Sequence, residues 1–176
     1  SRSTYVRGRL GGYQGRALEP GDRLPLGRPS VPLARIVGRA VRAEAIPEHG
    51  GEVEVRVILG PQADRFTPDA IAAFLEGPYE MTGESDRMGA RLKGPLITHT
   101  RGLDIISDGI PLGGVQVVGN GQPIILLVDR QSTGGYTKIA TVCSFDVGKV
   151  GLLMPRQRLR FRSVSVGEAH VALRAE

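Results

Sequence analysis

The segment 127–140 holds the densest group of side chains able to do chemistry. It follows the apolar run 123–128 and leads into the apolar run 139–143, each typical of a buried strand. Its polar and glycine residues are Asp129, Arg130, Gln131, Ser132, Thr133, Gly134, Gly135, Tyr136, Thr137 and Lys138. A turn between two strands needs only the glycines. The surplus of acid, cations, amide, hydroxyls and phenol on rigid strands predicts a binding or catalytic site.

Gly134 and Gly135 can adopt conformations that turn backbone N–H groups toward an anion, and Lys138 can add charge. Lys138 begins an apolar strand, so we expect its stem to pack while its ammonium group reaches the loop mouth. The alternative is a polar hairpin with a surface ion pair.

Two further groups are candidates. Arg87 and Arg91 are expected on one strand face, where two arginines can clamp a carboxylate or phosphate, unless this is a solvated edge strand. Asp108 precedes Gly109, and an Asp-Gly pair is a common hairpin turn. Gln116 follows, and its functional role would be to point into a barrel mouth.

The sequence shows no pattern typical of a metal site, a reactive cysteine or a known nucleotide-binding or nucleophile motif. His49, His99 and His170 show no metal-ligand spacing, so we predict no metal site from them. They are expected in a linker, at the end of a strand and on a surface helix, respectively. Cys143 lies in an apolar strand and is expected to pack as a small hydrophobe. No P-loop, dinucleotide fingerprint or nucleophile elbow is present.

Composition narrows the class of protein. The chain has 176 residues, a net charge of +5, one cysteine, 25 Gly and 12 Pro. A lone cysteine indicates a reducing compartment, so we predict a cytoplasmic protein. No apolar run approaches the roughly 18 residues that span a bilayer, so we expect no membrane partner. Arginines alternate with other residues over 156–163, which favours a solvated strand face over a nucleic-acid or other polyanion site.

The elements expected are mostly strands. Thr67 should cap a helix that begins at Pro68 and ends at Gly77, and Asp146 should cap a short helix over 147–154. The expected strands are 53–57, 79–81, 87–92, 113–118, 124–129, 138–145 and 159–164. Many strands, few helices and frequent turns predict a mainly β fold, a closed or nearly closed barrel with peripheral helices. Residues 1–48, rich in Gly, Arg and Pro, look unable to bury a core alone, and residues 49–176 form the barrel domain.

Six segments in this order resemble one family. They are Gly60-Pro61-Gln62-Ala63-Asp64-Arg65-Phe66, Ser85-Asp86-Arg87-Met88-Gly89, Ser107-Asp108-Gly109-Ile110, Gly121-Gln122-Pro123-Ile124, Asp129-Arg130-Gln131-Ser132-Thr133-Gly134-Gly135-Tyr136 and Arg160-Phe161-Arg162. The order resembles the KipA family, also described as allophanate hydrolase subunit 2, as the C subunit of 5-oxoprolinase and as half of the urea carboxylase carboxyltransferase domain. The family usually has Pro where this chain has Thr137, and Thr where it has Ser132.

The resemblance implies a fold and partners. The family fold is a pair of cyclophilin-like β-barrels, so residues 1–48 would be the tail and linker of a first barrel, in a chain expected to be part of a longer polypeptide. The implied function is that of a subunit of an ATP-dependent amide hydrolase, with ATP and magnesium shared with a KipI-like partner subunit. The alternatives are a biotin-dependent carboxyltransferase component acting on urea, and a regulatory antagonist of a KipI-like kinase inhibitor.

For an amide-handling enzyme we assign roles as follows. Arg130 and Lys138 would hold a phosphate or carboxylate, and Asp129 would act as a base or hold magnesium, so these three are the catalytic candidates. The substrate- or phosphate-binding candidates are Gln131, Thr133, Gly134, Gly135, Tyr136, Arg87, Arg91, Asp108 and Gln116.

Overall fold

A computed structural model describes residues 3–6, 8–43 and 51–175 of the chain. The chain divides into two compact units, Ser1–Ile46 and Pro47–Glu176. The expected boundary between residues 48 and 49 lies outside the described residues. That the first unit is the remnant of another barrel stays a prediction.

The first unit has little regular structure. It contains strands β1 (Thr4–Tyr5) and β2 (Leu10–Gly11) and the 3-10 helix η1 (Leu33–Arg35). No apolar side chain among residues 3–6 and 8–43 is buried, so this described part has no apolar core of its own.

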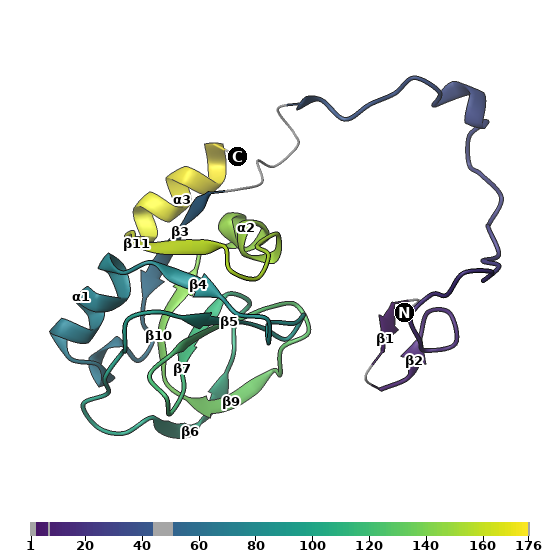
Figure 1. Ribbon diagram of the computed structural model, residues 1–176. Coiled ribbons are helices and arrows are strands. Elements are labelled where there is room, and N and C mark those ends of the chain that lie inside the picture. The colour runs from purple at the N-terminus through teal and green to yellow at the C-terminus, as the bar shows by residue number, and fades with distance from the viewer. Residues whose placement is uncertain (1–2, 7, 44–50, 176) are drawn as a thin grey trace. The chain divides into compact units, whose positions relative to one another are not determined.

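The second unit is built on a closed seven-stranded barrel (Figure 1). The strands follow one another around it in the order β10-β3-β11-β4-β5-β8-β7. Only β3 and β11 pair in parallel; the other neighbours are antiparallel. Their bounds are β3 (Glu52–Leu59), β4 (Tyr79–Met81), β5 (Gly89–Lys93), β7 (Gly114–Val117), β8 (Pro123–Leu126), β10 (Lys138–Val142) and β11 (Arg158–Ser163). The mainly β barrel predicted from the sequence is confirmed, with β8 and β10 each ending three residues early.

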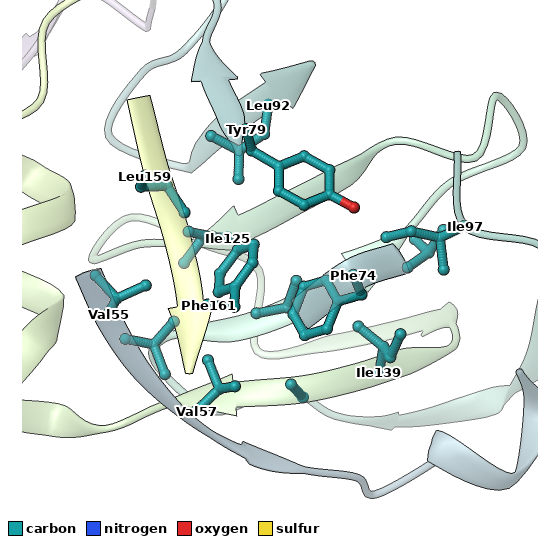
Figure 2. Close-up of a cluster of buried hydrophobic side chains, with 14 of the residues drawn as sticks. Val55, Val57, Phe74, Tyr79, Leu92, Ile97, Ile125, Ile139, Leu159 and Phe161 are labelled. Carbon is teal, nitrogen blue, oxygen red and sulfur yellow. The ribbon is translucent and has the colours of Figure 1, made fainter. Parts of the chain in front are cut away.

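An aromatic cluster in the core joins α1 (Pro68–Glu76) to the barrel strand β11. The rings of Phe74 and Phe161 stack at 4.2 Å, and Tyr79 lies 5.6 Å from Phe161 (Figure 2). Branched aliphatic residues complete this core, as expected for a chain with 5% aromatic residues.

Helix α1 begins as predicted. The Thr67 hydroxyl accepts the N–H of Ala70 at 3.0 Å, Pro68 takes the first helical position, and Gly77 forms the C-cap. Asp146 precedes α2 (Val147–Gly151), but its carboxylate makes no cap bond, and the helix is shorter than predicted. No helix among the described residues is long and apolar enough to span a bilayer.

The helix α3 (Val166–Ala175) confirms the surface helix expected around His170, and its start carries a sequence signal. Ser165 accepts the N–H of Glu168 through its hydroxyl at 3.2 Å, and Glu168 accepts the N–H of Ser165 at 2.7 Å. This reciprocal pair is a capping box, which the Ser-x-x-Glu spacing indicates.

A second, two-stranded sheet joins β6 (Asp104–Gly109) to β9 (Thr133–Tyr136). Figure 1 shows these two strands together at the side of the barrel away from α2 and α3. Two expectations are therefore wrong. Asp108-Gly109 ends a strand instead of forming a hairpin turn. The turn expected within the polar segment does not include Gly134 and Gly135, because residues 133–136 form β9.

The alternating arginines of β11 lie on a solvated face. Arg160 pairs with Glu52, and Arg162 pairs with Glu54 at 2.7 Å, both across the parallel ladder to β3. Because these charges are neutralised by their neighbours, a polyanion site is not favoured here.

Candidate functional site

Buried polar residues concentrate where β7 meets β10. Among the described residues four polar or charged side chains are buried, and three of them are Gln116, Thr137 and Lys138. The fourth, Asp146, is held elsewhere by Arg56. Since buried polar groups are expensive unless hydrogen-bonded, this cluster marks the candidate site.

Strand register places Gln116 and Lys138 opposite each other on the outer face of the barrel. The neighbours of Gln116 along β7, Val115 and Val117, both belong to the core, so Gln116 points away from the interior. The expectation that Gln116 faces a barrel mouth is therefore wrong. It is covered instead by β9, where the carbonyl of Tyr136 lies 3.5 Å from its side-chain amide nitrogen.

The ammonium group of Lys138 is buried and only partly satisfied. Its side chain is 1% exposed, and Nζ lies 3.2 Å from Oδ2 of Asp108, whose side chain is 54% exposed. A lysine carries three N–H donors. Asp108 is the only hydrogen-bond acceptor for them among the residues that the structure describes. Lys138 therefore does not reach the loop mouth as expected, and the surface ion pair is also excluded for it.

Gln62, absent from the sequence-based candidates, holds Lys138 and Asp108 in place. Its backbone N–H donates to the Lys138 carbonyl at 3.1 Å, and its Oε1 accepts the Lys138 N–H at 3.0 Å. Its Nε2 lies 3.5 Å from Oδ2 of Asp108. Apart from the family resemblance of the Gly60-Pro61-Gln62 segment, no sequence signal joins Gln62 to Lys138, because 76 residues separate them.

Asp108 is a carboxylate at neutral pH. The hydrogen bond from Lys138 lowers the pKa of Asp108, and the backbone N–H of Gly109 lowers it further. The pair is thus a buried cation and a half-exposed anion, open to solvent on the anion's side.

The two glycines of the polar segment act through their small size. Neither Gly134 nor Gly135 has a positive φ, and both lie in β9, so the expected anion-binding turn is wrong. A Cβ on Gly134 would lie 2.7 Å from Cδ1 of Ile110 and 3.3 Å from Nε2 of Gln116. Gly134 therefore lets β9 close over Gln116.

Asp129 and Arg87 form a different contact. Arg87 donates Nε to Oδ2 of Asp129 at 2.7 Å and Nη2 to Oδ1 at 3.1 Å, with both side chains partly exposed. The hydrogen bond from Arg87 lowers the pKa of Asp129, which makes Asp129 a weaker base. Both of its carboxylate oxygens are engaged, which does not favour the predicted roles of base or magnesium ligand.

Arg130 secures the loop. Its Nε donates to the carbonyl of Ile110 at 3.0 Å, and Nη1 lies 3.4 Å from the carbonyl of Leu127. These contacts to backbone oxygens indicate a structural role for Arg130, in place of the predicted phosphate contact.

The remaining candidates are spread over the surface. Thr133 and Tyr136 are exposed in β9, Gln131 is exposed in the preceding loop, and Arg91 is exposed on β5. Gln131 stays beside the site, since a Cβ on Gly134 would lie 3.6 Å from its Nε2. Arg91 lines a separate pocket.

Thr137, at the position where the resembled family usually has Pro, is fully buried. Its hydroxyl lies 2.8 Å from Nε2 of His99, and its N–H donates to the carbonyl of Leu103 at 3.1 Å. A proline could not make the second bond. Burial lowers the pKa of His99, so this imidazole is neutral at pH 7.

Two other features complete the surface. A cavity of about 450 Å³ has Asp86 and Arg87 in its lining, together with mostly apolar residues such as Leu112, Leu127 and Val150. No cluster of three or more His, Cys, Asp or Glu suited to a metal ion occurs within the described ranges.

The arrangement around Lys138 can bind an oxygen that carries negative charge. Two ammonium donors that no described residue engages, in a site partly shielded from water, interact more strongly with such an oxygen than the same donors in bulk water. A carboxylate oxygen or a polarised carbonyl oxygen satisfies this requirement.

Comparison with known proteins identifies relatives along nearly the whole chain. The family described as "Carboxyltransferase domain, subdomain A and B" matches residues 1–163. The C subunit of the 5-oxoprolinase of Escherichia coli is 33% identical over 96% of this chain and 52% of its own length. The urea amidolyase of Lachancea kluyveri is 30% identical over 94% of this chain and 10% of its own length.

Structure comparison gives the same result. The crystal structure of the K. lactis urea amidolyase superposes with a TM-score of 0.83 and 30% identity, over 97% of this chain and 11% of that one. The chain therefore spans about half the length of the bacterial relative and a small part of the fungal proteins.

Proposed function

Because the chain belongs to the family of carboxyltransferase domains, subdomain A and B, we propose that it is part of a subunit of an ATP-dependent amide hydrolase. The proposed type is the C subunit of 5-oxoprolinase, and the proposed substrate is a small amide or lactam. The similarity to the corresponding Escherichia coli subunit supports this reading.

The observation that carries the proposal is the buried ammonium group of Lys138. Among the described residues it has one acceptor, Asp108, which leaves two donors unused. A fold gains little by burying a cation with unused donors. A site that stabilises negative charge on a substrate needs such donors already in place.

In the proposed reaction Lys138 donates to the oxygen of the amide carbonyl. As a nucleophile adds to the carbonyl carbon, negative charge grows on that oxygen and the hydrogen bond strengthens. Asp108, ionised, accepts a hydrogen bond from Nζ of Lys138 and so aligns it, and Gln62 fixes both groups. ATP with magnesium, bound together with a KipI-like partner subunit, is the proposed source of free energy for opening the amide.

A second candidate is carboxyl transfer from carboxybiotin to urea. The similarity to urea amidolyases favours it, as does the TM-score of 0.83 with one of them. The same ammonium group would then stabilise the carboxylate in transit. A third candidate, a purely regulatory protein-binding module, is less favoured because docking does not need a buried cation with unused donors.

The test is turnover by the complete assembly, made of the full-length subunit and a KipI-like partner, with Lys138→Met. Loss of an oxyanion donor lowers rates about 10²-fold or more, and we expect that loss in ATP-dependent hydrolysis of 5-oxoproline. Lys149→Met is the matched control, since Lys149 also pairs with an aspartate, Asp146, but lies in α2. Unchanged turnover in Lys138→Met would contradict the proposal.

Assays of the complete assembly also distinguish the first candidate function from the second. Hydrolysis of 5-oxoproline with ATP supports the first, and urea-dependent decarboxylation of carboxybiotin supports the second. We expect the 176-residue chain by itself to show little or no turnover, because the proposed site is shared between subunits. Steady ATP-dependent turnover by this chain alone would show that a shared site is not required.

A further inference from the structure

A second polar pocket lies on the outer face of the barrel beside β5. Its volume is about 300 Å³, and its polar lining includes Thr82, Glu84, Arg91, Lys93 and Asn120. We call it the β5 pocket. The functional site described above does not use it.

Strand geometry directs two cations into this pocket. Arg91 and Lys93 alternate along β5 with Ala90 and Leu92, which belong to the core, so both cations project outward. Residues two apart on a strand lie about 7 Å from each other. Both head groups can therefore reach one small ligand.

Neither of these cations forms an ion pair of the kind found on β11, although Glu80 lies opposite Lys93 in the register of β4 and β5. On β11, Arg160 and Arg162 each pair with a glutamate of β3. Neither Arg91 nor Lys93 has an ion-pair partner within residues 51–175. Arg91 and Lys93 thus bring positive charge to a concave surface, and Glu84 in the lining balances part of it.

The wall of the pocket is fixed and carries an unsatisfied hydroxyl. Gln122 holds both the N–H and the carbonyl of Gly94, at 2.7 and 3.1 Å. The Thr82 N–H donates to the Arg91 carbonyl at 2.9 Å, which places Thr82 beside Arg91. The Thr82 hydroxyl oxygen is enclosed and has no hydrogen-bond partner among the described residues. Rotation about χ1 gives a threonine hydroxyl other staggered positions from which a ligand can be reached.

We propose that the β5 pocket binds a small carboxylate, held by Arg91 and Lys93, with Thr82 as a further donor. Glu84 leaves the lining with one net positive charge, which suits a monoanion better than a doubly charged phosphate. Glu84 can also accept a hydrogen bond from an ammonium or amide group of the same ligand.

This site is distinct from the one at Lys138. The register runs from Arg91 to Ile124, then Gln116, then Lys138, which is three strand spacings. Three spacings amount to about 14 Å along the curved sheet. Because the barrel is closed, outward-facing residues that far apart around it point in different directions, so one small carboxylate does not contact both cations. The inference therefore does not depend on the proposed function.

The test is a titration of the 176-residue chain with L-glutamate, followed by amide NMR shifts. We expect saturable shifts at Thr82 and Arg91. Arg91→Gln should weaken binding at least about tenfold, as expected for loss of a charge-assisted hydrogen bond. Arg162→Gln, the same change at an exposed but paired strand arginine, should leave binding unchanged. Thermal midpoints confirm folding of both variants.

Several results would overturn the inference. They are an absence of saturable shifts, equal weakening by both variants, and tighter binding of inorganic phosphate than of L-glutamate. Shifts confined to Asp108 and Lys138 would also overturn it, while supporting the anion-binding role proposed for Lys138. Lys93→Gln gives a second check, because it should weaken binding without touching the Arg91 backbone contacts.

Discussion

Asp146 and Lys138 are the two charged residues buried in the described part of the chain, and they differ in how fully they are hydrogen-bonded. Asp146 accepts the backbone N–H of Arg56 at 2.9 Å, two guanidinium N–H groups of Arg56 at 2.7 and 2.9 Å, and Nζ of Lys149 at 2.8 Å. Within the same described ranges the ammonium group of Lys138 has one acceptor, and that acceptor is half exposed.

We interpret the difference as that between a structural charge, Asp146, and the charge of the proposed site, Lys138. A buried charge whose hydrogen-bonding capacity is filled by the protein joins elements, here β3 to α2, and leaves nothing for a ligand. A buried charge with donors that the protein leaves unused can bind a ligand through those donors. Sequence patterns cannot make this distinction, because both residues stand in similar polar-to-apolar transitions.

The largest effect is expected from Asp146→Ala. Removing this carboxylate takes away the acceptor that holds the Arg56 guanidinium at the barrel wall, and breaking a buried pair costs about 3–5 kcal/mol. Urea unfolding measures the loss. Glu54→Gln, at the exposed pair with Arg162, is the control and should stay within about 0.5 kcal/mol. Equal losses of unfolding free energy in the two variants would show that the buried Asp146–Arg56 pair stabilises the fold no more than the exposed Glu54–Arg162 pair.

Lowering the pH should also reveal the contribution of the Asp146–Arg56 pair to the free energy of unfolding. Burial by itself would raise the pKa of Asp146, but the hydrogen bonds from Arg56 and Lys149 outweigh it and leave the pKa at about 2. Because this folded-state pKa lies below the unfolded value of 3.8, the stabilisation is present above about pH 4 and lost as pH falls toward 2. The loss amounts to about 2 kcal/mol.

Other carboxylates titrate over the same range, so the measurement is a difference. Unfolding free energies of the native chain and of Asp146→Asn are compared from about pH 5 to about pH 2. The variant should lose stability less steeply. Parallel curves would mean that Asp146 is not the residue protonated.

A smaller effect is expected where β9 closes over the Lys138 site. In Gly134→Ala the new Cβ meets Cδ1 of Ile110 at 2.7 Å, and such overpacking costs about 1 kcal/mol. In Gly148→Ala, within α2, nothing lies within 4 Å of the new Cβ, and alanine favours a helix by up to about 1 kcal/mol. Thermal midpoints of the two variants should therefore move in opposite directions, and a shift of the same sign in both would contradict the close packing at Gly134.

The smallest effect on stability is expected for Lys138→Met. Methionine has a similar length, removes the cost of burying the ammonium group, and leaves Asp108 able to be solvated. We expect a change within about 1 kcal/mol in the unfolding free energy, together with the large loss of turnover proposed above. Destabilisation as severe as that of Asp146→Ala would show that Lys138 is a structural charge after all.

Local signals predicted much of the fold. Thr67 and Pro68 set the start of α1, since a cap and a fixed φ act within one turn. Alternation along β3 and β11 predicted their inner and outer faces, because a strand repeats every two residues. The capping box before α3 is equally local, since Ser165 and Glu168 are three residues apart. A surface helix was predicted around His170, but its bounds were not.

The sequence named candidate site residues but did not predict how they are arranged. The sequence singled out Lys138, Asp108 and Gln116 from three separate segments, and the structure brings these together. It separates them from Asp129, which pairs with Arg87, and from Arg91, which lines another pocket.

The amino-acid sequence by itself determined the residue types, the barrel strands and the polar segment that contains β9. The tertiary structure decided which of these groups became a site. Asp108 and Gln62 lie 30 and 76 residues from Lys138, and only closure of the barrel, with β6 and β9 packed on its outer face, brings them within hydrogen-bonding distance. Burial and partner number, which distinguish Lys138 from Asp146, depend on those distant contacts and have no trace in local spacing.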